Sequence, residues 1–162
     1  MVPSRPPSNG AAKLSQGPTA TYMKPSVLKE VVLTFPMAPE MELLACEKAS
    51  AVARSMGMSQ DKIDEVKLAV IEACLNALEH SQAQPRQFQV TFSVLGRHEP
   101  EALQITVRDS GVGFAPANRG AAKERVPLSK RGWGLQIIEG LMDEVRIESG
   151  AGGTTVVMSK TR

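Results

Sequence analysis

An acid and an amide lie one helical turn apart near the middle of the chain. Glu72 and Asn76 belong to a segment with helical spacing of apolar residues, so both side chains leave the same side of the helix. A carboxylate at Glu72 can accept a proton, and the amide oxygen of Asn76 can bind Mg²⁺, a hard cation that prefers oxygen ligands. The pair alone does not exclude a second interpretation, in which it is the solvated edge of a mostly buried helix.

A second motif, Asp-x-Gly-x-Gly, follows a segment with the pattern of a strand. Asp109 offers a carboxylate, and Gly111 and Gly113 let the backbone turn and approach a ligand where a Cβ would collide. Asp-Ser-Gly also occurs in ordinary turns. However, Val112 and Phe114 are apolar and no new strand begins at once, so a plain turn is the weaker interpretation.

A third motif, Gly-x-Gly, opens an apolar helix. Gly132 and Gly134 precede Leu135, and glycines at a helix start present free backbone N–H groups to an anion. The preceding loop, 115–131, is basic and long enough to suggest a function. Its basic residues are Arg119, Lys123, Arg125, Lys130 and Arg131. We expect this loop to cover phosphate groups, with a merely solvated loop as the alternative.

The elements that must position these motifs follow from local patterns. Residues 1–26 are rich in proline and serine and predict a disordered tail, which leaves 27–162 as one folded domain. We expect helices over 39–56, 59–80 and 134–142, and strands over 31–35, 87–94, 103–108, 143–149 and 153–159. In the strands expected over 87–94 and 103–108, apolar and polar residues alternate, so one face of each strand is buried and the other faces solvent. The pattern predicts a two-layer α/β sandwich with a mixed, mainly antiparallel sheet and helices on one face.

The bulk composition excludes several function classes. A net charge of +2 over 162 residues does not call for nucleic acid or an anionic membrane as a partner. The first residues contain no apolar run typical of a secretory signal, and no apolar stretch approaches a membrane span. Cys46 and Cys74 lack the spacing of a metal site or a redox motif, so we expect two reduced, buried thiols in a cytoplasmic protein.

The order of the three motifs, closed by a Gly-Gly-Thr-Thr segment with Thr154 and Thr155, resembles a known family. It is similar to the ATPase superfamily of gyrase, heat-shock chaperones, histidine kinases and mismatch-repair proteins. Within it, the chain most resembles bacterial anti-sigma factor serine/threonine kinases. The resemblance covers roughly 29–160 and includes the segment 141–147 before the final Gly-Thr-Thr.

The resemblance implies roles for the residues of these motifs. Asn76 would hold Mg²⁺, Glu72 would be the general base, and Asp109 would accept a hydrogen bond from the adenine amino group of ATP. Gly111 and Gly113 would flank the hinge of a lid. Gly132 and Gly134 would contact phosphates, and Lys130, Arg131 and Leu135 would also belong to the ATP site. Thr154 or Thr155 would lie near the base.

Three functions remain open on the sequence. The first is an enzyme that phosphorylates an antagonist (anti-anti-sigma) protein on serine or threonine and sequesters a sigma factor, with a homodimer also possible. The second is a non-catalytic module that binds nucleotide and holds a protein partner. The third, a plain ATPase component, is disfavoured because no second domain is present to use the energy. The presence of both Glu72 and Asn76 favours the enzyme.

Overall fold

The computed structural model describes residues 25–80, 86–110 and 133–162, which form five strands and three helices. The strands are Ser26–Pro36 (β1), Gln87–Gly96 (β2), Pro100–Asp109 (β3), Glu144–Gly150 (β4) and Gly153–Thr161 (β5). The helices are Met41–Ser55 (α1), Gln60–His80 (α2) and Trp133–Leu141 (α3). Every helix and strand expected from the sequence is therefore present, with bounds that differ at the ends.

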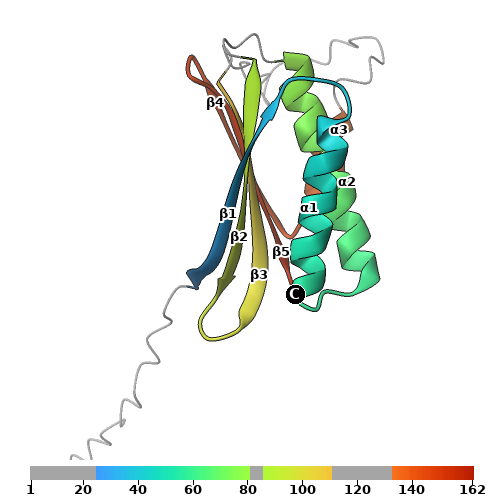
Figure 1. Cartoon of the computed structure of the whole chain (residues 1–162), viewed down its shortest axis with the longest axis vertical. Helices are drawn as coiled ribbons and strands as arrows, with labels where there is room; N and C mark the ends of the chain where they lie inside the picture. Colours follow the sequence, from blue (N-terminus) through green and yellow to red (C-terminus); the bar gives the residue numbers. More distant parts are fainter. Residues whose placement is uncertain (1–24, 81–85, 111–132) are drawn as a thin grey trace, which may run out of the picture.

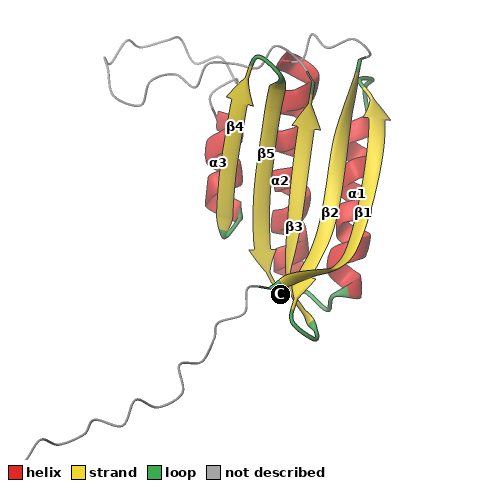
Figure 2. Cartoon of the chain, turned by 90° about the vertical axis from the view of Figure 1, so that its left-hand side faces the viewer, coloured by secondary structure: helices red, strands yellow, loops and turns green. Residues whose placement is uncertain are grey.

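The strands form one sheet in the order β1-β2-β3-β5-β4. All three helices cover the same face of this sheet, as the two perpendicular views show (Figures 1 and 2). The predicted two-layer α/β sandwich is thus confirmed. We expected a mixed, mainly antiparallel sheet. Each pairing between the described strands is antiparallel, so the described sheet contains no parallel pair.

The core lies between the sheet and the helices. Phe88, Val90 and Phe92 of β2 are buried on the face that meets the helices, while Gln87 and Gln89, which alternate with them, are exposed. On the other layer, α1 buries a stripe of small residues at helical spacing, namely Ala45, Ala49 and Ala53. Small side chains allow close packing of α1 against its neighbours, and most of the largest fully buried side chains lie on the strands.

Helix α2 begins where the sequence predicts. The backbone N–H of Lys62 donates a hydrogen bond of 3.4 Å to Oγ of Ser59, which satisfies one donor at the helix start. The helix then continues through His80 and carries Glu72 and Asn76 in its second half. Among the described helices, none is long and apolar enough to cross a membrane.

Strand β1 begins earlier than we expected. It starts at Ser26, whose Oγ donates a hydrogen bond of 3.2 Å to the carbonyl oxygen of Gly96. Lys29 and Glu30 interrupt the apolar pattern, but pairing with β2 keeps this stretch extended despite an irregularity between Val27 and Lys29. The expected boundary of the tail at residue 26 therefore falls on the first residue of the strand.

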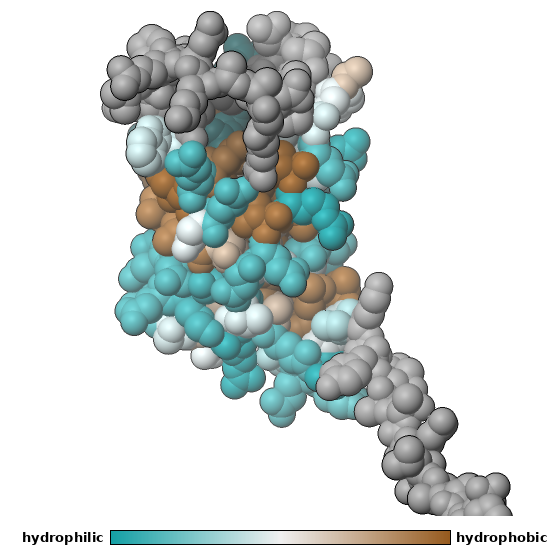
Figure 3. Space-filling model, turned by 180° about the vertical axis from the view of Figure 1, so that it is seen from behind, coloured by the Kyte–Doolittle hydropathy of each residue, from teal (hydrophilic) through white to brown (hydrophobic). Residues whose placement is uncertain are grey.

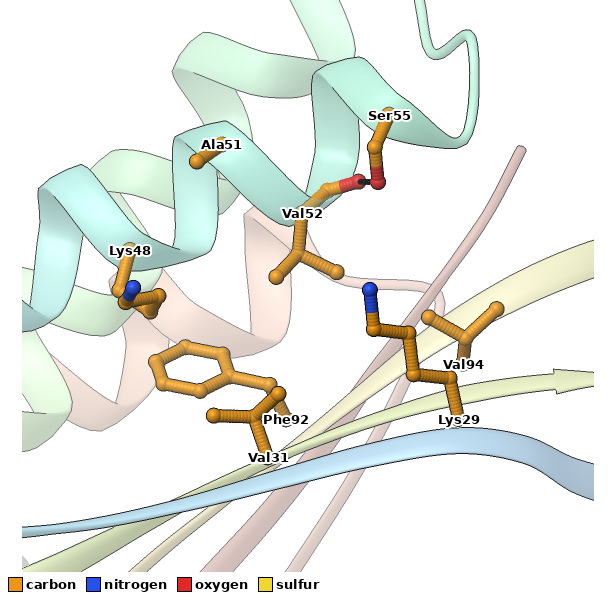
Figure 4. Close-up of a pocket in the computed structure, with 8 residues that line it drawn as sticks. All are labelled: Lys29, Val31, Lys48, Ala51, Val52, Ser55, Phe92 and Val94. Carbon is orange, nitrogen blue, oxygen red and sulfur yellow. Dashed lines mark hydrogen bonds between the residues drawn. The ribbon is translucent and has the colours of Figure 1, made fainter.

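The molecule has two notable surfaces, one beside α1 and β1 and the other at α3 and β4. Between α1 and β1 lies a groove of about 230 Å³, with Phe92 at its floor and Lys29 and Lys48 at its sides (Figure 4). Its lining residues among the described parts belong to α1, β1 and β2, so the groove is separate from Glu72 and Asn76 on α2. The opposite side of the molecule carries α3 and β4, where partly buried apolar side chains reach the surface between polar ones (Figure 3).

Candidate functional site

The backbone of α3 approaches the acid–amide pair of α2 very closely. Gly134 is buried at the start of α3, and a Cβ at this position would lie 3.1 Å from Oε2 of Glu72 and 3.2 Å from Oδ1 of Asn76. Such contacts are tighter than side chains normally make, so a residue without a side chain suits this approach. The structure therefore brings together three residues that the sequence predicted for one site.

The side chain of Asn76 has an unusual environment. Its amide nitrogen is buried and has no hydrogen-bond partner among the described residues. A buried polar atom without a partner is costly, and in native proteins it often marks a place for an ion, a water or a ligand. Because the nitrogen and oxygen of an amide exchange places when the group turns over, Asn76 can offer an oxygen at this position.

The donor set at this place fits Mg²⁺ bound together with phosphates. Among the described residues, no group of three His, Cys, Asp or Glu side chains could hold a metal ion by itself. Mg²⁺ commonly takes one or two oxygen ligands from a protein and completes its shell with substrate phosphates and water. Asn76 can supply such an oxygen beside the N-terminal end of α3.

A cavity of about 320 Å³ opens at this contact between α2 and α3. Its lining residues are Glu72, Leu75, Asn76, Glu79, Trp133, Gly134 and Ile137. Leu75 and Ile137 were not singled out from the sequence, although each follows a predicted site residue by about one helical turn. That spacing is the signal that could have found them. The cavity volume is within the range of small-molecule sites, roughly 300–1,000 Å³.

A second group of predicted residues meets where β3 ends. Asp109 is 6% exposed and faces the helices, and Thr154 of β5 lies directly opposite it in the sheet. Gly153 adopts φ 115°, and a Cβ there would lie 2.1 Å from the carbonyl oxygen of Asp109. Glycine is thus required for β5 to pass Asp109. The hydroxyl of Thr154 shares a hydrogen bond of 3.0 Å with that of Ser149.

Two other predicted residues lie elsewhere. The side chain of Thr154 is buried with Asp109, whereas Thr155, the next residue along the strand, belongs to the opposite face of the sheet. Leu135 is partly buried and packs against the hydrophobic core. Its backbone N–H belongs to the first turn of α3, where helix N–H groups can bind an anion.

The remaining predicted residues lie outside the described residues. They are Gly111, Gly113, Lys130, Arg131 and Gly132, together with the expected lid over 115–131. The described chain stops just after Asp109 and resumes at Trp133, so these residues connect the two described parts of the site in sequence.

A known protein family matches most of the chain. The family model described as "Histidine kinase-like ATPase domain" matches residues 35–160. The chain belongs to the histidine kinase-like ATPase family. This match extends from β1 to β5 and includes all the described site residues. It confirms the resemblance inferred from the order of the three motifs.

Members of this family with curated names are similar over most of the chain. Serine-protein kinase RsbW of Bacillus subtilis (strain 168) is 32% identical over 139 residues, which cover 80% of this chain and 84% of the relative. Anti-sigma F factor of Geobacillus kaustophilus (strain HTA426) is 33% identical over 135 residues, which cover 81% of this chain and 91% of the relative.

A solved structure supports the fold. The RsbU and RsbW domains of Rv1364c from Mycobacterium tuberculosis match with a TM-score of 0.62 and 22% identity over 83% of this chain. The match covers 33% of that longer chain, so the present chain corresponds to one part of it.

Proposed function

We propose that this protein is an ATP-dependent serine/threonine kinase that phosphorylates an antagonist protein and binds a sigma factor. Membership of the histidine kinase-like ATPase family supports the use of ATP. Relatives named serine-protein kinase and anti-sigma factor support the activity and the class of partner. The observation that supports the proposal is the close approach of Gly134 to both Glu72 and Asn76, because a carboxylate, an amide and the start of a helix meet there.

Each described residue of the site has a role in this proposal. ATP, when bound, supplies the γ-phosphoryl group. Glu72 accepts the proton of the serine or threonine hydroxyl as its oxygen bonds to the γ-phosphorus and ADP leaves, and Asn76 would hold Mg²⁺ through its amide oxygen. The backbone N–H groups at the start of α3, around Gly134 and Leu135, donate to phosphate oxygens. Asp109 accepts a hydrogen bond from the adenine amino group, with Thr154 beside it.

The residues that lie outside the described part keep the roles that the sequence suggests. Gly111 and Gly113 would form the hinge of the lid, and Gly132 would extend the phosphate-binding backbone. Lys130 and Arg131 would neutralise phosphate charge. Positioning and charge neutralisation dominate phosphoryl transfer, so this equipment is sufficient without a covalent intermediate on the protein.

Transfer of labelled phosphate tests the proposal. The protein is incubated with γ-labelled ATP, Mg²⁺ and candidate antagonist proteins encoded near its gene. We expect label on a serine or threonine of one antagonist, and Glu72→Gln should lower the rate roughly 10²- to 10⁴-fold because an amide cannot accept the proton. ATP affinity measured by calorimetry should be retained.

Glu79→Gln is the matched control, since Glu79 lines the same cavity but has no assigned role. It should transfer phosphate at the wild-type rate. A normal rate in Glu72→Gln would place the general base elsewhere. ATP binding without transfer to any antagonist would instead favour a non-catalytic module that holds its partner.

A further inference from the structure

A buried lysine joins three elements at the end of α3 that is remote from the acid–amide pair. Lys160 lies on the inner face of β5, and its side chain is only 10% exposed. Its ammonium group donates a hydrogen bond of 2.7 Å to the carbonyl oxygen of Leu141 and lies 3.4 Å from Oδ1 of Asp143. It also forms an ion pair with Glu65 of α2. One cation therefore connects α2, the end of α3 and β5.

The opposite charges of this cluster stabilise the charged forms of Lys160 and Asp143. Burial lowers the pKa of Lys160, but the hydrogen bond to Glu65 and the charge of Asp143 outweigh it, so the pKa is raised. Hydrogen bonds from the hydroxyl and then the backbone N–H of Thr161 lower the pKa of Asp143, against a smaller opposing effect of burial. Lys160 and Asp143 therefore both stay charged at neutral pH, and the lysine remains a donor to its partners.

The cluster and the candidate site hold opposite ends of one short helix. Leu141 is the last residue of α3, and its carbonyl oxygen belongs to the C-terminal turn, where a cation is favourable. Gly134, near the first residue, contacts Glu72 and Asn76. Glu65 precedes Glu72 by two helical turns on the same side of α2. Helix α3 thus runs antiparallel to α2, and both of its ends are attached to the side of α2 that carries Glu65, Glu72 and Asn76.

We propose that Glu65 and Lys160 are positioning residues for the nucleotide site. By holding the C-terminal end of α3 against α2, they fix the direction in which its N-terminal N–H groups point. This inference rests on the proposed function, since that function assigns the start of α3 to the phosphates of ATP. Asp143 anchors the same lysine to the β5 side but does not connect it with α2.

The test removes the link to α2 and leaves the lysine in place. Glu65→Met keeps the length and helix propensity of the side chain but has no acceptor for the ammonium group. Asp64→Met is the matched control, because Asp64 is the adjacent residue on α2 and bonds only Gln60 and Lys67 among the described residues. Asp143→Asn is the second variant, because it weakens the cluster without touching α2.

Three measurements are made on each full-length variant. Calorimetry gives the affinity for a non-hydrolysable ATP analogue with Mg²⁺, thermal unfolding gives stability, and acrylamide quenching reports the order around Trp133 without nucleotide. Trp133 is the only tryptophan and the first residue of α3, so its quenching follows the helix start. A misplaced α3 in Glu65→Met should lower the analogue affinity on the order of tenfold and alter quenching. Asp64→Met and Asp143→Asn should keep wild-type affinity and quenching, even where Asp143→Asn melts earlier.

The outcomes separate this inference from the proposed function. Wild-type affinity and quenching in Glu65→Met would overturn the positioning role. The role would also be overturned if, in all three variants, the loss of analogue affinity simply followed the loss of melting temperature. If the wild-type protein fails to bind the analogue, the proposed function is wrong. The quenching comparison then still decides whether Glu65 orders the start of α3.

Discussion

Gly134 lies against Asn76 so closely that a Cβ on the glycine would be 3.2 Å from Oδ1 and 3.3 Å from Nδ2 of the amide. In the same helix, the equivalent position on Gly140 has no heavy atom of the other described residues within 4 Å, apart from its chain neighbours and the backbone of the helix itself. The two glycines therefore separate the effect of a methyl group on the site from its effect on the helix.

We predict that Gly134→Ala weakens ATP binding while the protein stays folded. Alanine favours a helix over glycine by about 1 kcal/mol, which offsets part of the crowding. The added methyl group must displace the side-chain ends of Glu72 and Asn76, both of which the site needs. Calorimetric titration with ATP and Mg²⁺ measures the loss, and thermal unfolding monitors the fold.

Gly140→Ala is the control for this substitution. It should raise stability by up to about 1 kcal/mol because the position is exposed and open. Its ATP affinity should equal that of the wild type. Equal ATP affinity in Gly134→Ala and wild type would remove the contact at α2 from the nucleotide site.

We predict that Asp109→Asn weakens ATP binding and reduces the preference for adenine. Loss of a hydrogen bond to a charged group costs about 1.5–3 kcal/mol. An amide can also donate to the carbonyl oxygen that guanine carries in place of the adenine amino group, so binding of GTP should fall less than binding of ATP. Calorimetry with both nucleotides measures the ratio.

Asp109 is buried, so a folding control is needed for this variant. Unfolding curves identify the temperature at which the variant remains fully native, and titrations are made there. An unchanged ratio of ATP to GTP affinity in folded Asp109→Asn protein would contradict the assignment of this carboxylate to the base.

We predict that protonation of Asp143 at low pH weakens the cluster around Lys160 and lowers the stability of the protein. Its carboxyl has a folded pKa below the ordinary value near 4, because Thr161 donates to the charged form. The unfolded chain therefore binds this proton more readily than the native protein. The resulting stability is fully present above the ordinary pKa and is lost as pH falls through the lower, folded pKa.

The pH dependence can be measured by urea unfolding from about pH 3 to about pH 7, a range that includes the ordinary pKa of aspartate. We expect Asp143→Asn to be less stable than wild type at neutral pH, and the difference should shrink as the solution becomes acidic. A difference that stays constant down to the acid limit would show that the hydrogen bonds to Thr161 do not depend on the charge of Asp143.

Local patterns predicted the strands well because burial on one face repeats every second residue. Phe88, Val90 and Phe92 show this repeat and are buried as expected. The start of β1 was missed because Lys29 and Glu30 interrupt the repeat, and only pairing with β2 identifies them as strand residues. Residue types and spacing likewise placed Glu72 and Asn76 on one side of a helix.

Contacts between residues far apart in the chain could not be predicted from the sequence. Glu65 lies on the same side of α2 as Glu72, and nothing in its spacing shows that it pairs with Lys160 near the end of the chain. The burial of Lys160 depends on where α3 ends, which is set by packing in the folded protein. The choice between Thr154 and Thr155 also required the register of β5 against β3.

Finally, we predict that Trp133 reports nucleotide binding. It lines the cavity with Glu72 and Asn76, and 57% of its surface is exposed. The sequence contains one tryptophan and one tyrosine, Tyr22, so emission excited at the red edge comes from Trp133 alone. A bound nucleotide should order the backbone at the start of α3 and cover part of the indole.

The expected signal is a saturable change of Trp133 emission with ATP, smaller when Mg²⁺ is omitted and much reduced in Asn76→Ala. The dependence on Mg²⁺ follows because Asn76 would bind the metal that joins the phosphates to α2. Leu68→Gln is a suitable control, since Leu68 is exposed on α2 and lies outside the cavity lining; it should keep the full signal. Constant emission and quencher accessibility at saturating ATP, with binding confirmed by calorimetry, would contradict closure of the segment before α3 over the nucleotide. The contacts of Gly134 with Glu72 and Asn76 would then have to bind phosphates without a moving lid.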